Sequence, residues 1–216
     1  MKKAIVKAIL AATMLVSVAI GSVEPTNAAA ATTPAPAAGK TTTPVPVMTD
    51  NLSKYGLKKD LELPVTVTAG GLSYTLHKVM IYDFNSKDAK DLRKKYNYLD
   101  SMGMVPNPKY FIWTKITITN KSQKLIQKNF KSISSKWRLF FDSGMNDGEA
   151  YMPMPVASKF ENNSKKALND FTLNPGESLT TYQAVYYQGA FKYFEIFLNY
   201  NNQLKSQYVV GNSGSN

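Results

Sequence analysis

The residues of this chain that could carry acid–base chemistry are carboxylates, and glycoside hydrolysis requires a pair of them. The candidates lie in two groups, namely Asp83, Asp88, Asp91, Asp142, Asp147 and Glu149. The sequence alone does not set any two of them at a working separation. No nucleophile elbow, phosphate-binding glycine loop or metal-ligand spacing accompanies them. We therefore expect a protein that is not an enzyme, with glycoside chemistry kept as an alternative.

Oxygen ligands suited to a hard cation occur together in segment 142–149. They are Asp142, Asn146, Asp147 and Glu149. Their spacing differs from that of a calcium loop, and Asp, Asn and Gly are also the residues that turns prefer. We expect a loop without a metal, and the sequence indicates no cofactor.

The chain has no cysteine and a single histidine, His77. Without cysteine there are no disulfides, thiolate metal sites or thiol nucleophiles. His77 lies inside a stretch with the composition of a strand. Because no second His or Cys exists to partner it, we expect a half-buried strand residue with one hydrogen bond rather than a ligand or a base.

Positive charge is the strongest compositional feature, with 26 Lys and Arg against 15 Asp and Glu. A basic exported protein meets anionic polymers, such as teichoic acids, in contacts that weaken with salt. The alternative is that the charge only solvates the surface. No nucleic-acid-binding motif appears, so we expect an anionic cell-wall polymer or another extracellular protein as partner. The candidate contact residues are Arg93, Lys94, Lys95, Lys165 and Lys166.

Aromatic stacking on sugar rings is a second way for this chain to bind a ligand. The tyrosines that could serve it are Tyr96, Tyr98, Tyr186, Tyr187 and Tyr193. A carbohydrate-binding module would need them exposed. The alternative is that most belong to the core or to cross-strand pairs.

The N-terminal residues predict export. Residues 1–28 combine three lysines, an apolar run and small residues near Ala28, as in a cleaved signal peptide. The apolar run is too short to span a bilayer, which takes about 20 residues, so no integral membrane segment is expected after cleavage. Its removal leaves 23 Lys and Arg against 14 Asp and Glu, a net charge of +9. We expect a secreted protein, extracellular or associated with the cell wall.

The rest of the chain divides into a spacer, one domain and a tail. Residues 29–51 are rich in Ala, Thr and Pro and predict an unpacked spacer. Residues 52–210 form the domain, and 211–216 a flexible polar tail.

The stretch 110–122 is the element around which the domain is organised. Ile112, Thr114, Ile116 and Ile118 alternate with Phe111, Trp113, Lys115 and Thr117. Alternation of β-branched and aromatic residues predicts a strand with one face in a core. Before it, segment 61–82 reads as a hairpin turning at Gly70–Gly71.

Segment 86–99 breaks this pattern and predicts a short amphipathic helix. Apolar residues recur there at three- and four-residue spacing, namely Ala89, Leu92, Tyr96 and Leu99. Asn85 or Ser86 can cap its start. We expect this helix to cover the second face of strand 110–122, shielding Phe111 and Trp113.

Further short strands follow, with turn signals between them. We expect strands within 125–133, 137–142, 151–155, 171–173, 178–187, 191–200 and 203–210. The fold class is therefore all-β, an antiparallel immunoglobulin-like sandwich of about seven to nine strands with one short inserted helix.

Three segments together resemble a known pattern: a strand ending Thr117-Ile-Thr-Asn-Lys-Ser122, the stretch 137–151, and Leu173-Asn-Pro-Gly-Glu-Ser178. The chain is similar in these to the secreted immunoglobulin-like domains of Gram-positive bacteria whose function is unknown. The resemblance covers 57–210 and implies a small envelope β-sandwich without catalysis, but it brings no functional residues. This sequence lacks the lipoprotein cysteine of many relatives and adds the insertion 87–99.

Overall fold

A computed structural model of the chain describes residues 48, 50–98, 104–129, 137–141, 150–153, 155 and 160–212. Within these residues the protein is built of antiparallel strands with one α-helix, which confirms the all-β fold with a short inserted helix. No helix of the described part is long and apolar enough to cross a bilayer. The predicted signal peptide and the tail beyond 212 lie outside the described residues.

Eleven strands and two helical segments make up the described chain. They are the 3₁₀ helix Leu52–Tyr55, β1 (Leu57–Lys59), β2 (Val65–Ala69), β3 (Leu72–Asp83), α1 (Lys87–Lys95), β4 (Tyr110–Asn120), β5 (Ile126–Lys128), β6 (Trp137–Phe140), β7 (Ala150–Tyr151), β8 (Phe171–Leu173), β9 (Ser178–Tyr187), β10 (Phe194–Tyr200) and β11 (Gln203–Asn212). Eleven exceeds the expected seven to nine because four strands have only two or three residues, too few to show a period.

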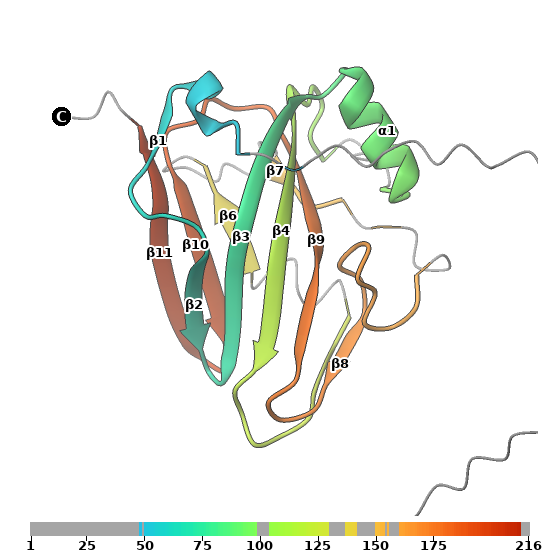
Figure 1. The fold of residues 1–216 in the computed structure, drawn as a ribbon, viewed down its shortest axis with the longest axis vertical. Coiled ribbons are helices and arrows are strands. Elements are labelled where there is room, and N and C mark those ends of the chain that lie inside the picture. Colours follow the sequence, from blue (N-terminus) through green and yellow to red (C-terminus); the bar gives the residue numbers. More distant parts are fainter. Residues whose placement is uncertain are drawn as a thin grey trace, which may run out of the picture. The chain divides into compact units, whose positions relative to one another are not determined.

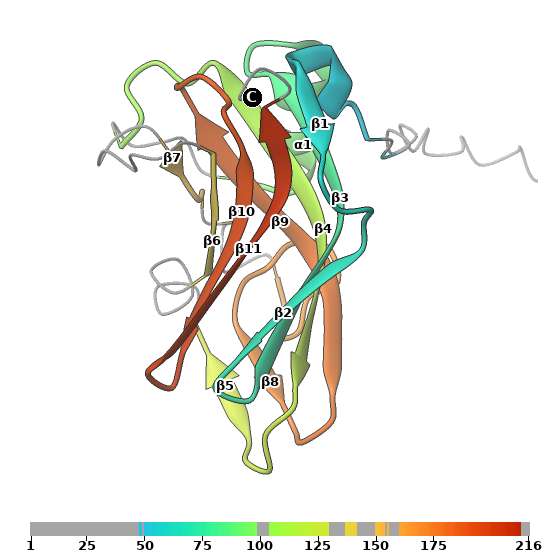
Figure 2. The same cartoon turned by 90° about the vertical axis from the view of Figure 1, so that its left-hand side faces the viewer.

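Two sheets face each other across the main core, as the side view in Figure 2 shows. The larger sheet has the order β2-β3-β4-β9-β7 and faces the viewer in Figure 1. The smaller has the order β1-β11-β10-β6. A third pair, β5–β8, contributes Ile126, Phe171 and Leu173 to the same core.

Strand β4 is the centre of the larger sheet, paired over its whole length with β3 and over most of it with β9. Ile112, Ile116 and Ile118 are buried in the core between the sheets, as the alternation predicts. Phe111 and Trp113 are also fully buried, although they point to the opposite face. The first half of β4 is therefore covered on both faces and the second half on one.

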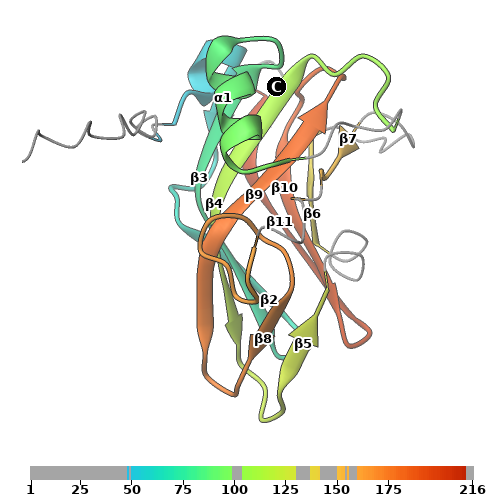
Figure 3. The same cartoon turned by 90° about the vertical axis from the view of Figure 1, so that its right-hand side faces the viewer.

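The helix α1 covers that outer face, as expected. Ser86 caps it, its Oγ accepting a hydrogen bond from the backbone N–H of Ala89 at 3.3 Å. Ala89 and Leu92 pack in one cluster with Phe111 and Trp113. Figure 3 shows α1 and the β5–β8 pair on opposite sides of β9.

The helix is shorter than its periodicity predicts. It ends at Lys95, not Leu99, because Asn97 takes a left-handed backbone conformation with φ 49°. Asn adopts that conformation more readily than most residues. Tyr98 then forms an isolated bridge with Pro155, and Leu99 lies outside the described residues.

A bulge in β3 keeps the core pattern intact. The register with β4 shifts between Leu76 and Lys78, leaving His77 as the extra residue. Leu76 and Val79 are consequently both fully buried in the main core, although they are three residues apart. Without the bulge, alternation would turn one of them outward.

Two of the three segments of the family resemblance, 117–122 and 173–178, meet at one end of the sandwich. The buried Asn120 side chain donates to the carbonyls of Lys124 and Leu173 and accepts from the N–H and hydroxyl of Ser122. Its backbone N–H donates to Glu177 and its carbonyl accepts from Gly176. The Asn-Lys-Ser and Pro-Gly-Glu motifs thus tie two loops together, which is a structural role.

Residues just before 52 belong to this packed structure, although the sequence pattern assigns 29–51 to the spacer. Asn51 bonds both backbone groups of Ile81, its amide donating to the carbonyl at 2.6 Å and its oxygen accepting from the N–H at 2.9 Å. It therefore occupies the edge of β3 that β2 does not reach. Met48 is 8% exposed and packs in the cluster under α1.

Candidate binding face

The outer face of the larger sheet changes character halfway along its strands. Near α1 its side chains are aromatic and buried, as with Trp113 and Tyr186. Beyond Trp113, the outward residues of β4 are Lys115, Thr117 and Thr119, all partly exposed. The lower half of this face, turned to the viewer in Figure 1, is thus open and polar.

Two rows of hydroxyl side chains cross the open half, one residue from each of β2, β3, β4 and β9. The first hydroxyl row is Thr66, Thr75, Thr117 and Thr180. The second hydroxyl row is Thr68, Ser73, Thr119 and Ser178. In each row the residues are direct cross-strand partners, so antiparallel register alone aligns them.

The hydroxyls of these rows bond to one another in pairs. In the first row Thr66 lies 2.7 Å from Thr75, and Thr117 lies 2.7 Å from Thr180. In the second row the Thr68–Ser73 and Thr119–Ser178 distances are 2.7 and 2.8 Å. These bonds restrain the side chains of each pair relative to one another.

A third row, on the side toward α1, brings positive charge. Lys78, Lys115 and Tyr182 are cross-strand partners on β3, β4 and β9. We call them the lysine row. Lys78 is exposed, and its Nζ donates to the carbonyl of Met48 at 3.2 Å.

His77 joins the lysine row to the first hydroxyl row. Its Nε2 lies 2.7 Å from the Oγ1 of Thr117, so the expected half-buried residue with a single hydrogen bond is confirmed. Partial burial, and then the charge of Lys115, lower the pKa of His77 below its ordinary value. The pKa of the only histidine therefore depends on the charge and burial of this face.

No carboxylate opposes this charge. None of the outward positions of β2, β3, β4 and β9 that make up the three rows is Asp or Glu. The ion pairs of the described residues lie elsewhere, at Lys59 with Asp50 and Glu62 and at Lys87 with Asp91.

Two pairs of lysines predicted as contact residues, Lys94–Lys95 and Lys165–Lys166, belong to segments that contact Tyr182 of the lysine row. Lys94 and Lys95 are exposed at the end of α1 and immediately precede Tyr96, whose ring lies 6.0 Å from that of Tyr182. Lys165 and Lys166 are exposed in the loop before β8. Two residues later, the Leu168 N–H donates to the Tyr182 carbonyl at 2.7 Å. Two segments 70 residues apart thus approach the same border of the face.

Arg93 differs from the lysines beside it. Its guanidinium lies 3.7 Å from the centre of the Phe84 ring, and its Nη2 donates to the Phe84 carbonyl at 3.0 Å. The side chain is partly buried. The structure thus gives Arg93 a packing role that the sequence did not indicate.

The tyrosines considered for sugar stacking are mostly core residues, which agrees with the alternative that they belong to the core or to cross-strand pairs. Tyr96, Tyr98, Tyr186 and Tyr187 are between 0 and 8% exposed. Each completes an aromatic cluster, as in the 5.5 Å approach of Tyr96 to Trp113. Tyr193 is partly exposed and lies edge-on to Tyr208, 5.1 Å away.

The carboxylates considered for catalysis or metal binding do not form a site among the described residues. Asp142, Asp147 and Glu149, with the whole segment 142–149, lie outside them. Asp91 pairs with Lys87 at 2.6 Å on the exposed side of α1. No group of three or more metal-ligating acidic or histidine side chains occurs in the described part of the chain.

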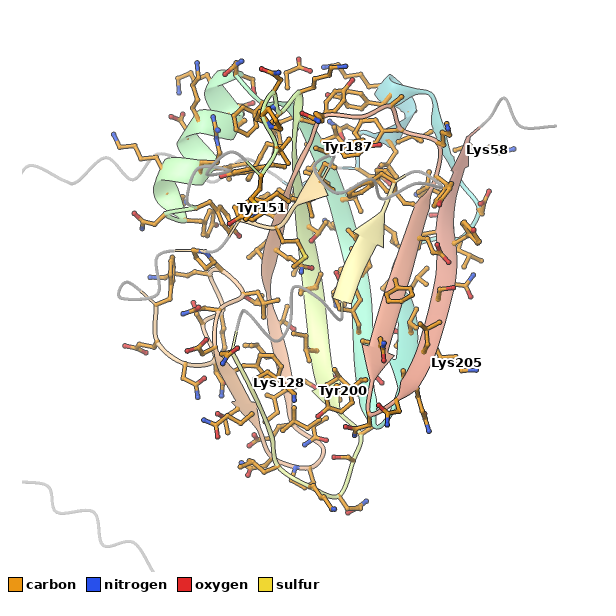
Figure 4. The ribbon with its side chains drawn as sticks, turned by 180° about the vertical axis from the view of Figure 1, so that it is seen from behind. Lys58, Lys128, Tyr151, Tyr187, Tyr200 and Lys205 are labelled. Atoms are coloured by element: carbon orange, nitrogen blue, oxygen red, sulfur yellow. The ribbon has the colours of Figure 1, made fainter. Side chains whose placement is uncertain are left out.

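A separate polar pocket of about 330 Å³ lies beside the β5–β8 pair. Its lining residues are Gln127, Lys128, Asn129, Asn162, Asp170 and Phe171. Lys128 also reaches 5.3 Å from the Tyr200 ring, and the two are labelled in Figure 4.

The chain shows only limited similarity to known proteins. No protein-family model matches the chain, and no curated protein matches it. The crystal structure of the yjhA protein from Bacillus subtilis is 19% identical, with a TM-score of 0.38 over 62% of this chain and 77% of that chain. A candidate lipoprotein of the same species, ycdA, is 13% identical, with a TM-score of 0.43 over 71% of this chain and 40% of that chain.

Proposed function

We propose that this protein is an exported, non-catalytic module of the cell envelope that binds an anionic polymer. The observation that supports the proposal best is the gathering of lysines around an open sheet face without carboxylates. Lys78 and Lys115 lie on the face, and two lysine pairs border it at Tyr182. The proposal includes export by residues 1–28 and an immunoglobulin-like arrangement of the two facing sheets.

The charge of this border suits a polyanion for an electrostatic reason. Lysine ammonium groups are compact, well-hydrated charges that attract an anion over about a Debye length, roughly 8 Å at physiological salt. Lys94 and Lys95 end a helix, where the macrodipole favours cations. They are therefore stabilised in place without a carboxylate that would compete with the ligand.

The test is sedimentation of the mature protein with purified cell walls, with and without their teichoic acids, over a salt series. Wild-type protein should bind at low salt, lose binding as salt rises, and require the teichoic acids. Lys94→Glu/Lys95→Glu should weaken binding at least tenfold. Arg93 is left unchanged because its loss would disturb the packing on Phe84.

The matched control carries the same change in net charge elsewhere. Lys58 and Lys205 are exposed on the other sheet, labelled in Figure 4. Lys58→Glu/Lys205→Glu should bind nearly as well as wild type. Equal losses in both double variants would mean that only net charge matters, and absence of binding at low salt would refute the proposal.

A further inference from the structure

We propose that the two hydroxyl rows are the contact surface for a phosphodiester chain, which lies across the strands beside the lysine row. This inference rests on the proposed function and assigns its ligand class and its site. The rows belong to four neighbouring strands. Thr66, Thr68, Ser178 and Thr180 are exposed, Thr75, Thr117 and Thr119 are partly exposed, and Ser73 is buried.

The hydroxyl pairs still have hydrogen atoms to donate. A pair such as Thr66–Thr75 uses one of its two hydroxyl hydrogens in the bond between its members. The other hydrogen points away from the pair and is available to an acceptor. The same holds for Thr68–Ser73 and Thr119–Ser178. Each of these pairs therefore presents one donor, carried by whichever hydroxyl accepts the bond within the pair.

The spacing of the donors is regular because the sheet is regular. Neighbouring strands lie about 4.8 Å apart, and residues two apart along a strand are separated by about 6.8 Å. The rows therefore form a strip about 14 Å long and about 7 Å wide, with the lysine row one further step away. A polymer with repeating acceptor groups can contact several donors of such a strip at once.

The chemistry of the face favours phosphate over carboxylate. A planar carboxylate is best matched by the planar fork of arginine, and the outward positions of the three rows include no arginine. Hydroxyls and ammonium groups donate singly, from separate directions. This arrangement suits the tetrahedral oxygens of a phosphodiester, whose single negative charge the lysine row offsets.

His77 sets how many hydrogens the remaining hydroxyl pair, Thr117–Thr180, can offer. A protonated His77 can only donate to Thr117, so the pair keeps one hydrogen for the ligand after the bond between its two members. A neutral His77 with an unprotonated Nε2 accepts from Thr117 instead. The pair then has no hydrogen to offer.

The experiment measures binding of purified poly(glycerol phosphate) chains over a salt series. Thr75→Val/Thr117→Val/Thr180→Val keeps the β-branched shape and removes three hydroxyls. We expect about a tenfold or greater loss of affinity, since each hydrogen bond contributes modestly, with an unchanged slope of log K against log salt. Lys78→Gln/Lys115→Gln should instead make that slope shallower, because fewer counterions are released.

Thr172→Val and polyglutamate serve as controls, and the outcomes below separate failure of this inference from failure of the proposed function. Thr172→Val, on β8 outside the rows, should bind as wild type does. Unchanged affinity of the triple variant, or equally tight binding of polyglutamate by wild type, would overturn the hydroxyl-row inference while leaving charge-directed binding intact. No binding of poly(glycerol phosphate) at low salt would overturn both. Unaltered melting of the triple variant ensures that a loss reports on contact.

Discussion

At the scale of single residues, His77 links the folding of the chain to its candidate surface. Its pKa is lowered in the folded protein, chiefly by burial and then by Lys115. The unfolded chain therefore binds a proton more readily near pH 6.5 than the folded chain does. The contribution of His77 to stability should therefore fall as the pH drops through about 6.5 toward the lower folded pKa.

The corresponding prediction compares wild type with His77→Gln between pH 5 and pH 7.5. Glutamine keeps a polar partner for Thr117 and does not titrate. The wild-type free energy of unfolding should decrease toward pH 5 by more than that of the variant, measured by urea denaturation. Parallel curves for the two proteins would show that His77 has the same pKa in both states.

A substitution at Tyr98 should increase the stability of the folded protein. The Tyr98 hydroxyl is buried beside the Trp113 indole N–H, but the two do not form a well-aligned hydrogen bond, and the buried Tyr82 hydroxyl is also unpaired. A buried unpaired polar group costs about 1–3 kcal/mol. Tyr98→Phe should therefore raise the melting temperature in scanning calorimetry, whereas Tyr74→Phe, which removes a bond to Gln183, should lower it.

At the scale of elements, two turns lock the sheets together at the end opposite α1. The Gly70 N–H donates to the Gln203 side chain at 2.9 Å, and its carbonyl accepts from Asn201 at 2.9 Å. A Cβ on Gly70 would lie 2.1 Å from the Tyr200 carbonyl oxygen. The β2–β3 turn can therefore approach the β10–β11 turn only because residue 70 is glycine.

Gly70→Ala should consequently cost more than the left-handed conformation alone. That conformation costs about 1–2 kcal/mol for other residues. Gly176, with φ +81° and nothing within 4 Å of an added Cβ, isolates this cost. In urea denaturation Gly70→Ala should lose about 3 kcal/mol or more, clearly more than Gly176→Ala. Equal losses would mean that the two turns do not need their close contact.

Because α1 covers β4, the fluorescence emission of Trp113 can be predicted. Trp113 is fully buried and stacks on Tyr182 at 4.6 Å. With Trp137→Phe, Trp113 becomes the only tryptophan of the chain, and its emission should be blue-shifted. Adding Leu92→Asp should shift the emission to the red, because a charge at this buried helix position separates α1 from the sheet. A Lys90→Asp control, on the exposed side, should not.

The long elements were predictable from the sequence, and the short ones were not. Strand β9 has the expected bounds, and Phe194, Ile196, Leu198 and Tyr200 share the buried face of β10 as predicted. In both β9 and β10 the alternation of inward and outward residues extends over seven or more residues. β1 and β7 depend on partners distant in sequence, which no local period reveals.

The candidate site was predictable only in its pieces. The alternating Thr-x-Thr stretches at 66–68 and 117–119, with Ser73-x-Thr75 and Ser178-x-Thr180, are visible in the sequence. They become rows only through strand register, which is determined by pairing between residues up to 63 positions apart. Burial of Tyr96, Tyr98 and Tyr186 was likewise decided by α1 folding back on the sheet, whereas Tyr187 is buried in the main core.

At the scale of the whole molecule, the domain begins earlier than composition suggests. Met48 and Asn51 contribute buried contacts, and Asp50 pairs with Lys59 at 3.3 Å. A chain starting at residue 44 should melt at the same temperature as one starting at residue 29. One starting at residue 52 should melt several degrees lower, because it loses the Asn51 bonds to Ile81. Identical melting of both would assign these residues to the spacer.

The pairing of Asp83 with Tyr110 separates the insertion from the sheet that carries it. The ends of segment 84–109 leave and re-enter the fold at adjacent points, so β3 and β4 keep their register whatever connects them. The segment can therefore be exchanged, in evolution or by engineering, while the sheet is kept. Exchanging it would alter, in one step, both the lid on the aromatic half of the face and the lysines at its border.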